Sequence, residues 1–277
     1  MQTKDRYLIA IDLDDTVLNE LFSLNVQSVW SLINAQDAGH IVMIATARPT
    51  CIALPYYRAL GLHSLLSTVN GNYLYHPDDP SIPMIRHELC AEHTQQVLSA
   101  MEELSIRHAW IHNDDDLYTL DGVYPPHPYW RLLFRHSRVH TMASLPRIAA
   151  GRIMAQADTQ AQLEEMKKRF ENVPGVIVGG GPNGFGTWNV TVMPESANKW
   201  YTVQEAARYY GIDDDHIACF GDENNDRMMV MNARHGFVMC NGNPGLIADM
   251  KALHKGVTTY PCREGGVGYE VDKLLKG

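Results

Sequence analysis

Short apolar runs alternate with amphipathic segments in the first part of the chain. Residues 7–11 (YLIAI) are consecutively apolar, which is typical of a strand buried on both faces. A helical pattern follows over about 24–38 and ends at a glycine, as many helices do. Strand-like runs at 41–46 and 65–69 flank a segment after Pro49 that we expect to be helical. This order predicts a parallel sheet with helices on its faces.

The same alternation returns toward the C-terminus. Residues 216–222 (HIACFGD) and 236–240 (GFVMC) have the composition of strands, and residues 224–232 and 244–253 that of helices. We therefore expect both ends of the chain to build one α/β core, a Rossmann-like doubly wound sheet.

The middle of the chain has a different texture. From about 76 to 193 the sequence contains proline-bearing loops and shorter strand-like runs, with one amphipathic helix predicted over 159–171. This change predicts a second domain of α+β character, inserted at 82–190 into a core made of 1–81 and 191–277.

Composition and charge disfavour some classes of binding partner and some cellular locations. The chain has 277 residues and a formal net charge of −9, with no basic stripe, so nucleic-acid binding is disfavoured. No apolar stretch approaches the roughly 18 residues that cross a bilayer, and no secretory signal opens the chain. The five dispersed cysteines fit reduced core thiols. We expect a cytoplasmic protein, and no sequence feature sets its oligomeric state.

Acidic side chains follow the first predicted strand directly. Ligands of open parallel sheets bind beyond the carboxyl ends of the strands, where Asp12 and Asp14 would lie on the same side of the chain. Two like charges this close require a bound cation or a shared proton, and oxygen ligands suit a hard ion such as Mg²⁺. The alternative is that these aspartates cap the following helix.

Polar side chains also end two other predicted strands, and a lysine begins a helix. Thr46 and Asp222 end strands, Asn225 and Asp226 follow one turn later, and Lys199 lies in a first helical turn. Singly, these are ordinary features: a helix N-cap at Thr46, a polar loop and a solvated lysine. Together they favour phosphoryl transfer to an aspartate, with Mg²⁺ and lysine neutralising charge.

Four motifs resemble those of the haloacid-dehalogenase-like phosphohydrolases, specifically the Cof-type branch with a type IIB cap. DLDDT at 12–16, ATAR at 45–48, SANK at 196–199 and GDENND at 221–226 resemble the family's first to fourth motifs, in order. The segment VNGNYLY and the C-terminal tail are also similar, so the resemblance covers the whole chain. It implies the α/β core, the inserted cap and phosphatase chemistry.

The resemblance implies a role for each motif residue. Asp12 would be the nucleophile that forms an aspartyl-phosphate. Asp14 would protonate the leaving oxygen and then deprotonate the attacking water. Thr46 would hold the transferring phosphoryl group, and Lys199 would screen charge between it and the nucleophile. Asp222 would complete the Mg²⁺ shell with Asp12 and the backbone carbonyl of Asp14.

Other motif residues would surround this centre, and three depart from the family's pattern. Ala47, Asn225 and Asp226 would support the phosphate, the metal and the lysine. Asp15 and Ala47 stand where glycine is common, and Trp200 follows the lysine where glycine is frequent. No catalytic atom is removed, but we expect the bulky Trp200 ring to crowd access to the site.

Substrate specificity is expected in the inserted domain, acting as a cap that shields the reaction from water. Arg131, Arg135 and His136 lie among aromatic residues, and Arg48 ends the second motif. These four are candidate contacts to an anionic or hydroxyl-rich substrate, and a solvated surface is the alternative for each.

The function predicted first is a Mg²⁺-dependent phosphatase that acts on small phosphorylated metabolites, such as sugar phosphates or a phosphorylated cofactor. A phosphomutase or phosphotransferase would use the same aspartyl-phosphate and pass the group to a hydroxyl. A third alternative is a non-catalytic protein that binds phosphorylated ligands on the same scaffold.

Overall fold

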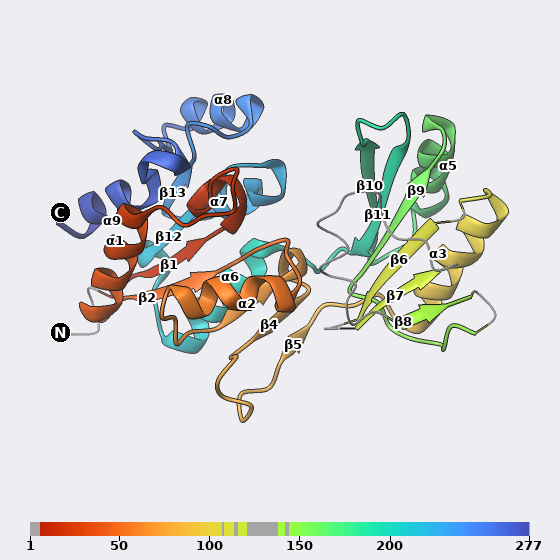
Figure 1. The fold of residues 1–277 in the computed structure, drawn as a ribbon, viewed down its shortest axis with the longest axis horizontal. Helices are drawn as coiled ribbons and strands as arrows, with labels where there is room; N and C mark the ends of the chain where they lie inside the picture. Colours follow the sequence, from red (N-terminus) through yellow and green to blue (C-terminus); the bar gives the residue numbers. More distant parts are fainter. Residues whose placement is uncertain (1–5, 107, 114–115, 121–137, 142–143, 277) are drawn as a thin grey trace. The chain divides into compact units, whose positions relative to one another are not determined.

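The protein consists of two compact units. The computed structural model describes residues 6–106, 108–113, 116–120, 138–141 and 144–276 (Figure 1). The first unit comprises Met1–Arg48, Ala53–Ile85 and Asn198–Gly277, and the second Pro49–Ile52 and Arg86–Ala197. The insertion expected from the sequence pattern was 82–190.

A five-stranded parallel sheet forms the centre of the first unit, in the order β14-β13-β12-β1-β2. Its strands are β1 (Leu8–Ile11), β2 (Ile41–Ile44), β12 (Ile217–Gly221), β13 (His235–Val238) and β14 (Gly256–Val257). All four residues of β1 are buried, as its uninterrupted apolar run predicts. Because β2 and β12 lie on opposite sides of β1, its carboxyl end is the point where ligands bind in such sheets.

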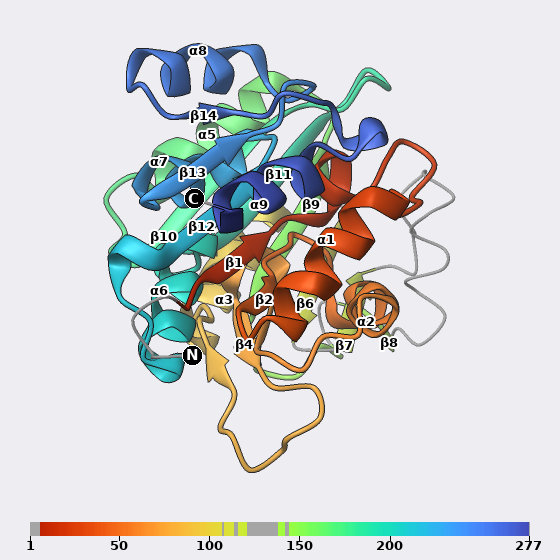
Figure 2. The same cartoon turned by 90° about the vertical axis from the view of Figure 1, so that its left-hand side faces the viewer.

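Helices cover both faces of this sheet, so the predicted doubly wound core is confirmed (Figure 2). Apolar side chains of α1, α2 and α9 pack with Ile9 and Ile11 of β1, and those of α6 and α7 pack with Leu8 and Ala10 on the other face. None of the helices in the described ranges is long and apolar enough to span a membrane. The helices are α1 (Val26–Asp37), α2 (Thr50–Ala59), α6 (Lys199–Tyr210), α7 (Arg227–Asn232), α8 (Pro244–Ala252) and α9 (Gly266–Lys276).

Capping residues and glycines determine where helices α1 and α6 begin and end. The Asn25 side chain accepts hydrogen bonds from two backbone N–H groups at the start of α1, and Gly39, with φ of 93°, follows its end. Asn198 caps α6 by accepting from the backbone N–H of Trp200, and Gly211 ends it with φ of 65°. The predicted helix at 24–38 is confirmed as α1.

A small sheet follows in the order β3 (Leu66–Thr68), β4 (Tyr73–Tyr75) and β5 (Ile85–Arg86), and in it β3 and β4 are antiparallel. A parallel bridge between Ala45 and Ser67 joins it to the end of β2. The turn between β3 and β4 has three consecutive positive φ angles, which end at Gly71. A Cβ atom at Gly71 would lie 2.5 Å from the backbone of Asn198, so the turn and the start of α6 meet only through glycine.

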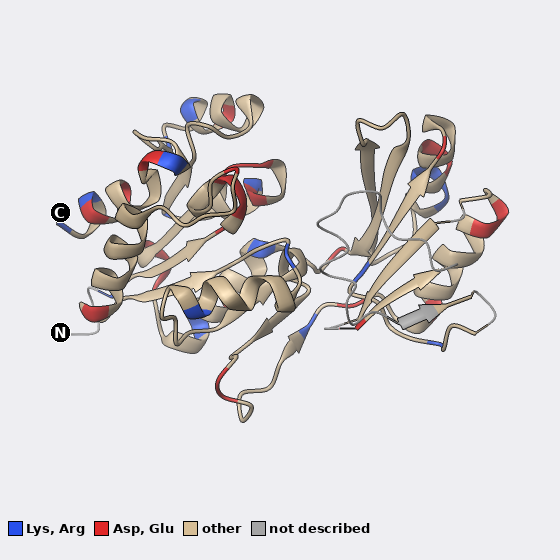
Figure 3. Cartoon of the chain, viewed as in Figure 1, with Lys and Arg blue, Asp and Glu red and all other residues tan. Residues whose placement is uncertain are grey.

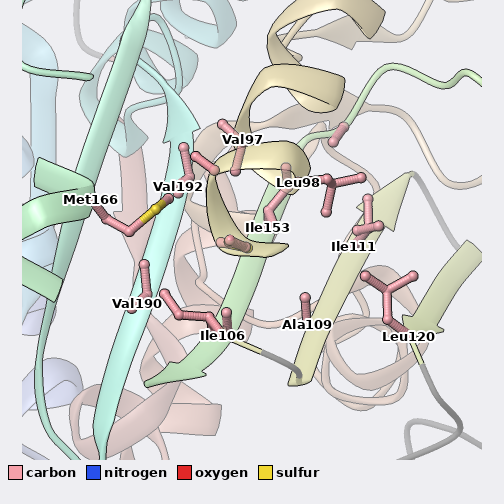
Figure 4. Packing of buried hydrophobic residues seen from close by; sticks show 14 of the residues in the cluster. Val97, Leu98, Ile106, Ala109, Ile111, Leu120, Ile153, Met166, Val190 and Val192 are labelled. Atoms are coloured by element: carbon pink, nitrogen blue, oxygen red, sulfur yellow. The ribbon is translucent and has the colours of Figure 1, made fainter. Parts of the chain in front are cut away.

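The second unit is an α+β structure, as predicted. Its six-stranded sheet has the order β10-β11-β9-β6-β7-β8. Leu98 of α3 and Met166 of α5 pack with Ile111, Ile153 and Val192 in one apolar core (Figure 4). The elements are α3 (Ala91–Glu103), α5 (Gln160–Phe170), β6 (His108–Asn113), β7 (Asp116–Leu120), β8 (Arg138–His140), β9 (Arg152–Ala157), β10 (Val176–Pro182) and β11 (Trp188–Pro194).

The cysteines are free thiols, but the expectation that all five are core residues is wrong. Cys219 in β12 and Cys262 are buried, whereas Cys51, Cys90 and Cys240 are exposed. Cys51 lies in the first turn of α2 and Cys90 is the N-cap of α3, positions at the edges of elements.

Candidate active site

The chain turns sharply where β1 ends. Asp12 is extended, and the next five residues form a turn closed by a 2.8 Å hydrogen bond from the backbone N–H of Leu18 to the carbonyl of Leu13. Asp15 in this turn has a left-handed φ of 49°. That conformation costs most L-residues about 1–2 kcal/mol, and aspartate tolerates it better than most. The need for positive φ explains why both glycine and aspartate suit this position.

A buried lysine bridges two carboxylates at the centre of the site. The Nζ atom of Lys199 donates to Oδ1 of Asp12 at 2.8 Å and to Oδ1 of Asp226 at 2.6 Å. Lys199 is only 1% exposed, and both aspartates are buried. The first turn of α6 thus delivers a cation to the end of β1. The alternative of a solvated surface lysine is wrong, because the side chain is buried.

The loop after β12 supplies two more carboxylates. Oδ2 of Asp226 accepts from the backbone N–H groups of Asp222 and Glu223, at 3.0 and 3.2 Å. Oδ1 of Asp222 accepts from the Thr16 hydroxyl at 3.0 Å. A Cβ atom at Gly221 would lie 2.4 Å from Cβ of Asp226, so glycine at the end of β12 permits this close packing.

Burial dominates the electrostatics of the site. Burial, with a smaller contribution from Asp226, raises the pKa of Asp12 to about 7 against the opposing attraction of Lys199. Burial, together with Asp12 and Asp226, raises the pKa of Asp222 to about 8. For Lys199, burial lowers the pKa, but Asp12 and Asp226 outweigh it and the net direction is upward. The cluster holds more carboxylates than its lysine neutralises.

A bound divalent cation would neutralise this excess of negative charge. One oxygen each of Asp12, Asp222 and Asp226 lies within 4.8 Å of the others. Acidic residues colour the ends of β1 and β12 in Figure 3. Both Asp226 oxygens already accept hydrogen bonds, from Lys199 and from two backbone groups. Asp12 and Asp222 therefore fit a hard cation best, whereas Asp226 holds the lysine.

The end of β2 brings a hydroxyl to the same edge of the sheet. Thr46 is fully buried, and its Oγ1 accepts from the backbone N–H of Arg48 at 3.2 Å. Its hydroxyl proton is thus directed away from that group, and it remains able to donate to a phosphoryl oxygen. The alternative of a helix N-cap is wrong, because α2 begins at Thr50. Ala47 is half-buried in the same loop.

The other predicted residues have mixed outcomes. Asn225 donates from Nδ2 to Oδ1 of Asn70 at 3.0 Å, which links the fourth motif to the β3–β4 turn. The Trp200 ring is 9% exposed and packs with Leu8 and Val203 in the core, so the expectation that it crowds access to the site is wrong. Arg48 lies on the Asp14 carboxylate. The three candidates in the insertion, Arg131, Arg135 and His136, lie outside the described residues.

Sequence reasoning missed three polar residues that support this site. Thr16 donates to Asp222, Asn70 accepts from Asn225, and Asn198 caps the helix that begins with Lys199. Thr16 closes the DLDDT motif, Asn70 opens the Asn-Gly turn and Asn198 precedes the lysine. Their position beside motif residues was the available signal.

Curated relatives align over most of the chain. The 5-amino-6-(5-phospho-D-ribitylamino)uracil phosphatase YitU of Bacillus subtilis is 25% identical over 252 residues, which cover 87% of this chain and 89% of the relative. The pyridoxal phosphate phosphatase YbhA of Escherichia coli is 25% identical over 260 residues, covering 87% and 90%. The HMP-PP phosphatase of Cronobacter sakazakii is 24% identical over 254 residues, covering 88% of each.

Solved structures share the fold, and a family model matches the sequence. A haloacid dehalogenase-like hydrolase from Bacteroides thetaiotaomicron aligns with a TM-score of 0.78 at 16% identity, over 97% of this chain and 99% of that one. A Thermotoga maritima protein aligns with a TM-score of 0.78 at 20% identity, over 97% of both chains. The model of the haloacid dehalogenase-like hydrolases matches residues 9–270. This chain belongs to the haloacid dehalogenase-like hydrolases, as its four motifs indicated.

Proposed function

We propose that this hydrolase is a Mg²⁺-dependent phosphatase of small phosphomonoesters that works through an aspartyl-phosphate on Asp12. The observation that carries the proposal is the buried ion cluster, in which Lys199 orients one oxygen of Asp12. An aspartate held at the carboxyl end of a central strand, with a cation beside it, suits attack on a phosphoryl group. The three relatives named above are phosphatases of small phosphorylated compounds, which supports the same class of substrate.

In the first step, an Asp12 oxygen attacks phosphorus and the bond from phosphorus to the leaving oxygen breaks. Asp14 gives its proton to that oxygen, so the alcohol leaves neutral. The Thr46 hydroxyl donates to a phosphoryl oxygen, and Lys199 balances the negative charge that gathers between nucleophile and phosphate.

In the second step, water attacks the phosphorus of the aspartyl-phosphate. Asp14 accepts a proton from the water, the bond between phosphorus and the Asp12 oxygen breaks, and inorganic phosphate leaves. The two steps consume one water and one ester and return Asp12 and Asp14 to their starting protonation states.

Asp12 and Asp222, with the backbone carbonyl of Asp14, would hold the Mg²⁺. Their fit rests on geometry, because one oxygen of Asp12 and one of Asp222 lie within 4.8 Å of each other, and burial raises the pKa of both side chains. Bound Mg²⁺ would supply positive charge to the phosphoryl oxygens. Asp226 and Asn225 would keep Lys199 and the β3–β4 turn in place. The inserted unit would select among substrates.

Release of inorganic phosphate tests this proposal. The wild-type protein is assayed with pyridoxal phosphate, sugar phosphates and a pyrimidine phosphate, each with Mg²⁺ and with a chelator. We expect Mg²⁺-dependent release from at least one compound and no turnover by Asp12→Asn. Transfer of phosphate to an added alcohol in preference to water would favour a phosphotransferase. Tight binding without turnover across the panel would favour a non-catalytic protein.

A further inference from the structure

Arg48 makes a two-point contact with Asp14. Its Nε donates to Oδ2 of Asp14 at 2.8 Å, and its Nη2 donates to Oδ1. The Arg48 side chain is 5% exposed, whereas the Asp14 side chain is 45% exposed. This planar fork matches both carboxylate oxygens, so it fixes the direction of the carboxylate as well as its charge. A lysine at this position would supply the charge without the second point of contact.

Two aromatic rings hold the guanidinium in turn. Its Cζ atom lies 5.3 Å from the ring centroid of Phe22 and 5.0 Å from that of Tyr56, distances at which a cation is attracted to an aromatic face. The Tyr56 hydroxyl donates to the backbone carbonyl of Phe22 at 3.1 Å, which joins the two rings into one aromatic clamp. Tyr56 belongs to α2 and Phe22 to the loop that follows the Asp14 turn.

The loop that presents Phe22 is built at a conformational cost. Phe22 has φ of 57°, a left-handed conformation that is uncommon for a large side chain. Asn19 stabilises it: its Oδ1 accepts from the backbone N–H groups of Leu21 and Ser23, both at 3.0 Å, and its carbonyl accepts from Phe22. The chain keeps this strained conformation, and hydrogen bonds with Asn19 stabilise it, which indicates that the position of the Phe22 ring beside Arg48 is important.

We propose that Arg48, held by the aromatic clamp of Phe22 and Tyr56, is a positioning residue that fixes the Asp14 carboxylate for proton transfer. The inference rests on the proposed function, in which Asp14 is the acid and base. A proton-transfer group acts only within about 2.6–3.2 Å of its partner atom, and a half-exposed carboxylate at a turn samples several rotamers unless another group holds it. Arg48 supplies that restraint: when Asp14 carries its proton for the first step, one carboxyl oxygen still accepts from the guanidinium and the O–H of the other faces the leaving oxygen. Arg48 is therefore not primarily a contact to substrate.

The backbone of Arg48 keeps a second task that side-chain variants leave intact. Its N–H donates to the Thr46 hydroxyl, and this hydrogen bond does not depend on the side chain. Substitution of the Arg48 side chain therefore removes the contact that orients Asp14 and keeps the hydrogen bond that orients Thr46.

The proposal predicts an effect that depends on the leaving group. The ratio kcat/KM reports the steps up to formation of the aspartyl-phosphate, where an alkyl leaving group needs a proton and 4-nitrophenolate does not. For Arg48→Met, we expect kcat/KM for an alkyl phosphate to fall at least about tenfold more than for 4-nitrophenyl phosphate. Phe22→Leu, a milder change that keeps the ion pair, should move the ratio in the same direction by a smaller factor.

A double-mutant cycle with Asp14→Asn tests the inference, and Arg58→Met is its matched control. Arg58 lies in α2, the helix that carries Tyr56; it pairs with Asp78, and its Cζ atom lies 5.6 Å from the Tyr57 ring centroid. If Arg48 acts through Asp14, adding Arg48→Met to Asp14→Asn lowers kcat/KM for the alkyl phosphate less than about twofold further. Arg58→Met should leave both substrates at wild-type rates.

Three results separate the possible failures. If the two losses multiply, or if Arg48→Met raises KM equally for both substrates, Arg48 contacts the phosphate and the positioning role is wrong. If Asp14→Asn leaves both rates unchanged, the proposed acid and base is wrong and the inference falls with it. If the wild-type protein hydrolyses neither ester, the proposed function is overturned as well. Melting temperatures of each variant show whether it is folded.

Discussion

At the scale of single residues, Lys199 holds the candidate active site together by pairing with Asp12 and Asp226. It is a buried cation between two buried carboxylates, so its removal leaves negative charge without compensation in a place water does not reach. We expect Lys199→Met to lower the free energy of unfolding by about 3 kcal/mol near neutral pH, because breaking a buried ion pair costs that much. We also expect kcat to fall about 10²- to 10³-fold. Urea unfolding and phosphate release measure the two effects.

Lys167→Met provides the comparison for this variant. Lys167 lies on the surface of α5, and its Nζ atom is 2.9 Å from Glu164. Exposed pairs of this kind contribute little, so the change should stay within about 0.5 kcal/mol and leave activity intact. Equal losses of stability in the two variants would contradict the structural role given to Lys199.

The motif residues could be identified from the sequence, but their partners could not. Arg48 was expected to contact substrate, yet its guanidinium lies on Asp14, which is 34 positions away in the chain. Trp200 was expected at the site, yet its ring faces the core because α6 turns that side toward the sheet. Periodicity and motif spacing describe single elements, whereas these outcomes depend on how two elements meet.

At the scale of elements, the junction of β12 with the following turn sets the position of Asp226. In Gly221→Ala, the added methyl would collide with the Asp226 side chain and push it away from Lys199. We expect a loss of about 1–3 kcal/mol in the free energy of unfolding and at least about tenfold lower kcat. Thermal unfolding and phosphate release measure both.

Gly179→Ala is the matched substitution in a strand. Gly179 lies in β10, and a Cβ atom there would meet no atom within 4 Å. Its stability should stay within about 0.5 kcal/mol of wild type. If Gly221→Ala behaved in the same way, the close packing of Gly221 on Asp226 would not matter for the site.

The order of strands and helices could be predicted from hydrophobic period, because buried parallel strands and amphipathic helices leave clear signals. The runs at 7–11 and 41–46 correspond to β1 and β2, and the helix expected over 159–171 corresponds to α5. The five-residue turn after β1 could not be predicted, since a left-handed residue such as Asp15 leaves no signal in the hydrophobic pattern. The antiparallel pairing of β3 with β4 depends on the turn at Asn70.

At the scale of the whole molecule, proton and metal binding are linked to stability. The folded chain keeps protons on Asp12 and Asp222 up to pKa values of about 7 and about 8, compared with an ordinary value of 3.8. Between about pH 4 and 8 the folded state therefore binds more protons than the unfolded state, so these groups make stability fall as pH rises. Mg²⁺ would replace the protons and remove that penalty.

We therefore expect a fixed concentration of Mg²⁺ to raise Tm by at least about 3 °C more at pH 8 than at about pH 5.5. Thermal unfolding with and without Mg²⁺ at both pH values measures this difference. Asp222→Asn should lose most of the Mg²⁺ effect at pH 8. An equal shift at both pH values would mean that Mg²⁺ does not bind at these carboxylates.

The fold alone does not fix the chemistry of this molecule. Structures with TM-scores of 0.78 share it at 16–20% identity, and one fold hosts many activities. The activity must therefore be argued from the cluster of Asp12, Lys199, Asp222 and Asp226 and from the hydroxyl of Thr46.

Identification of the phosphorylated residue tests the central claim most directly. Asp14→Asn is mixed with radiolabelled 4-nitrophenyl phosphate and Mg²⁺, because this leaving group needs no proton, and is quenched in acid. One portion is treated with hydroxylamine; in the other, reduction converts the phosphorylated aspartate to homoserine, which marks its position for mass spectrometry after digestion. The account predicts label that hydroxylamine removes and homoserine at position 12. Label on any other residue, or wild-type turnover by Asp12→Asn, would contradict it.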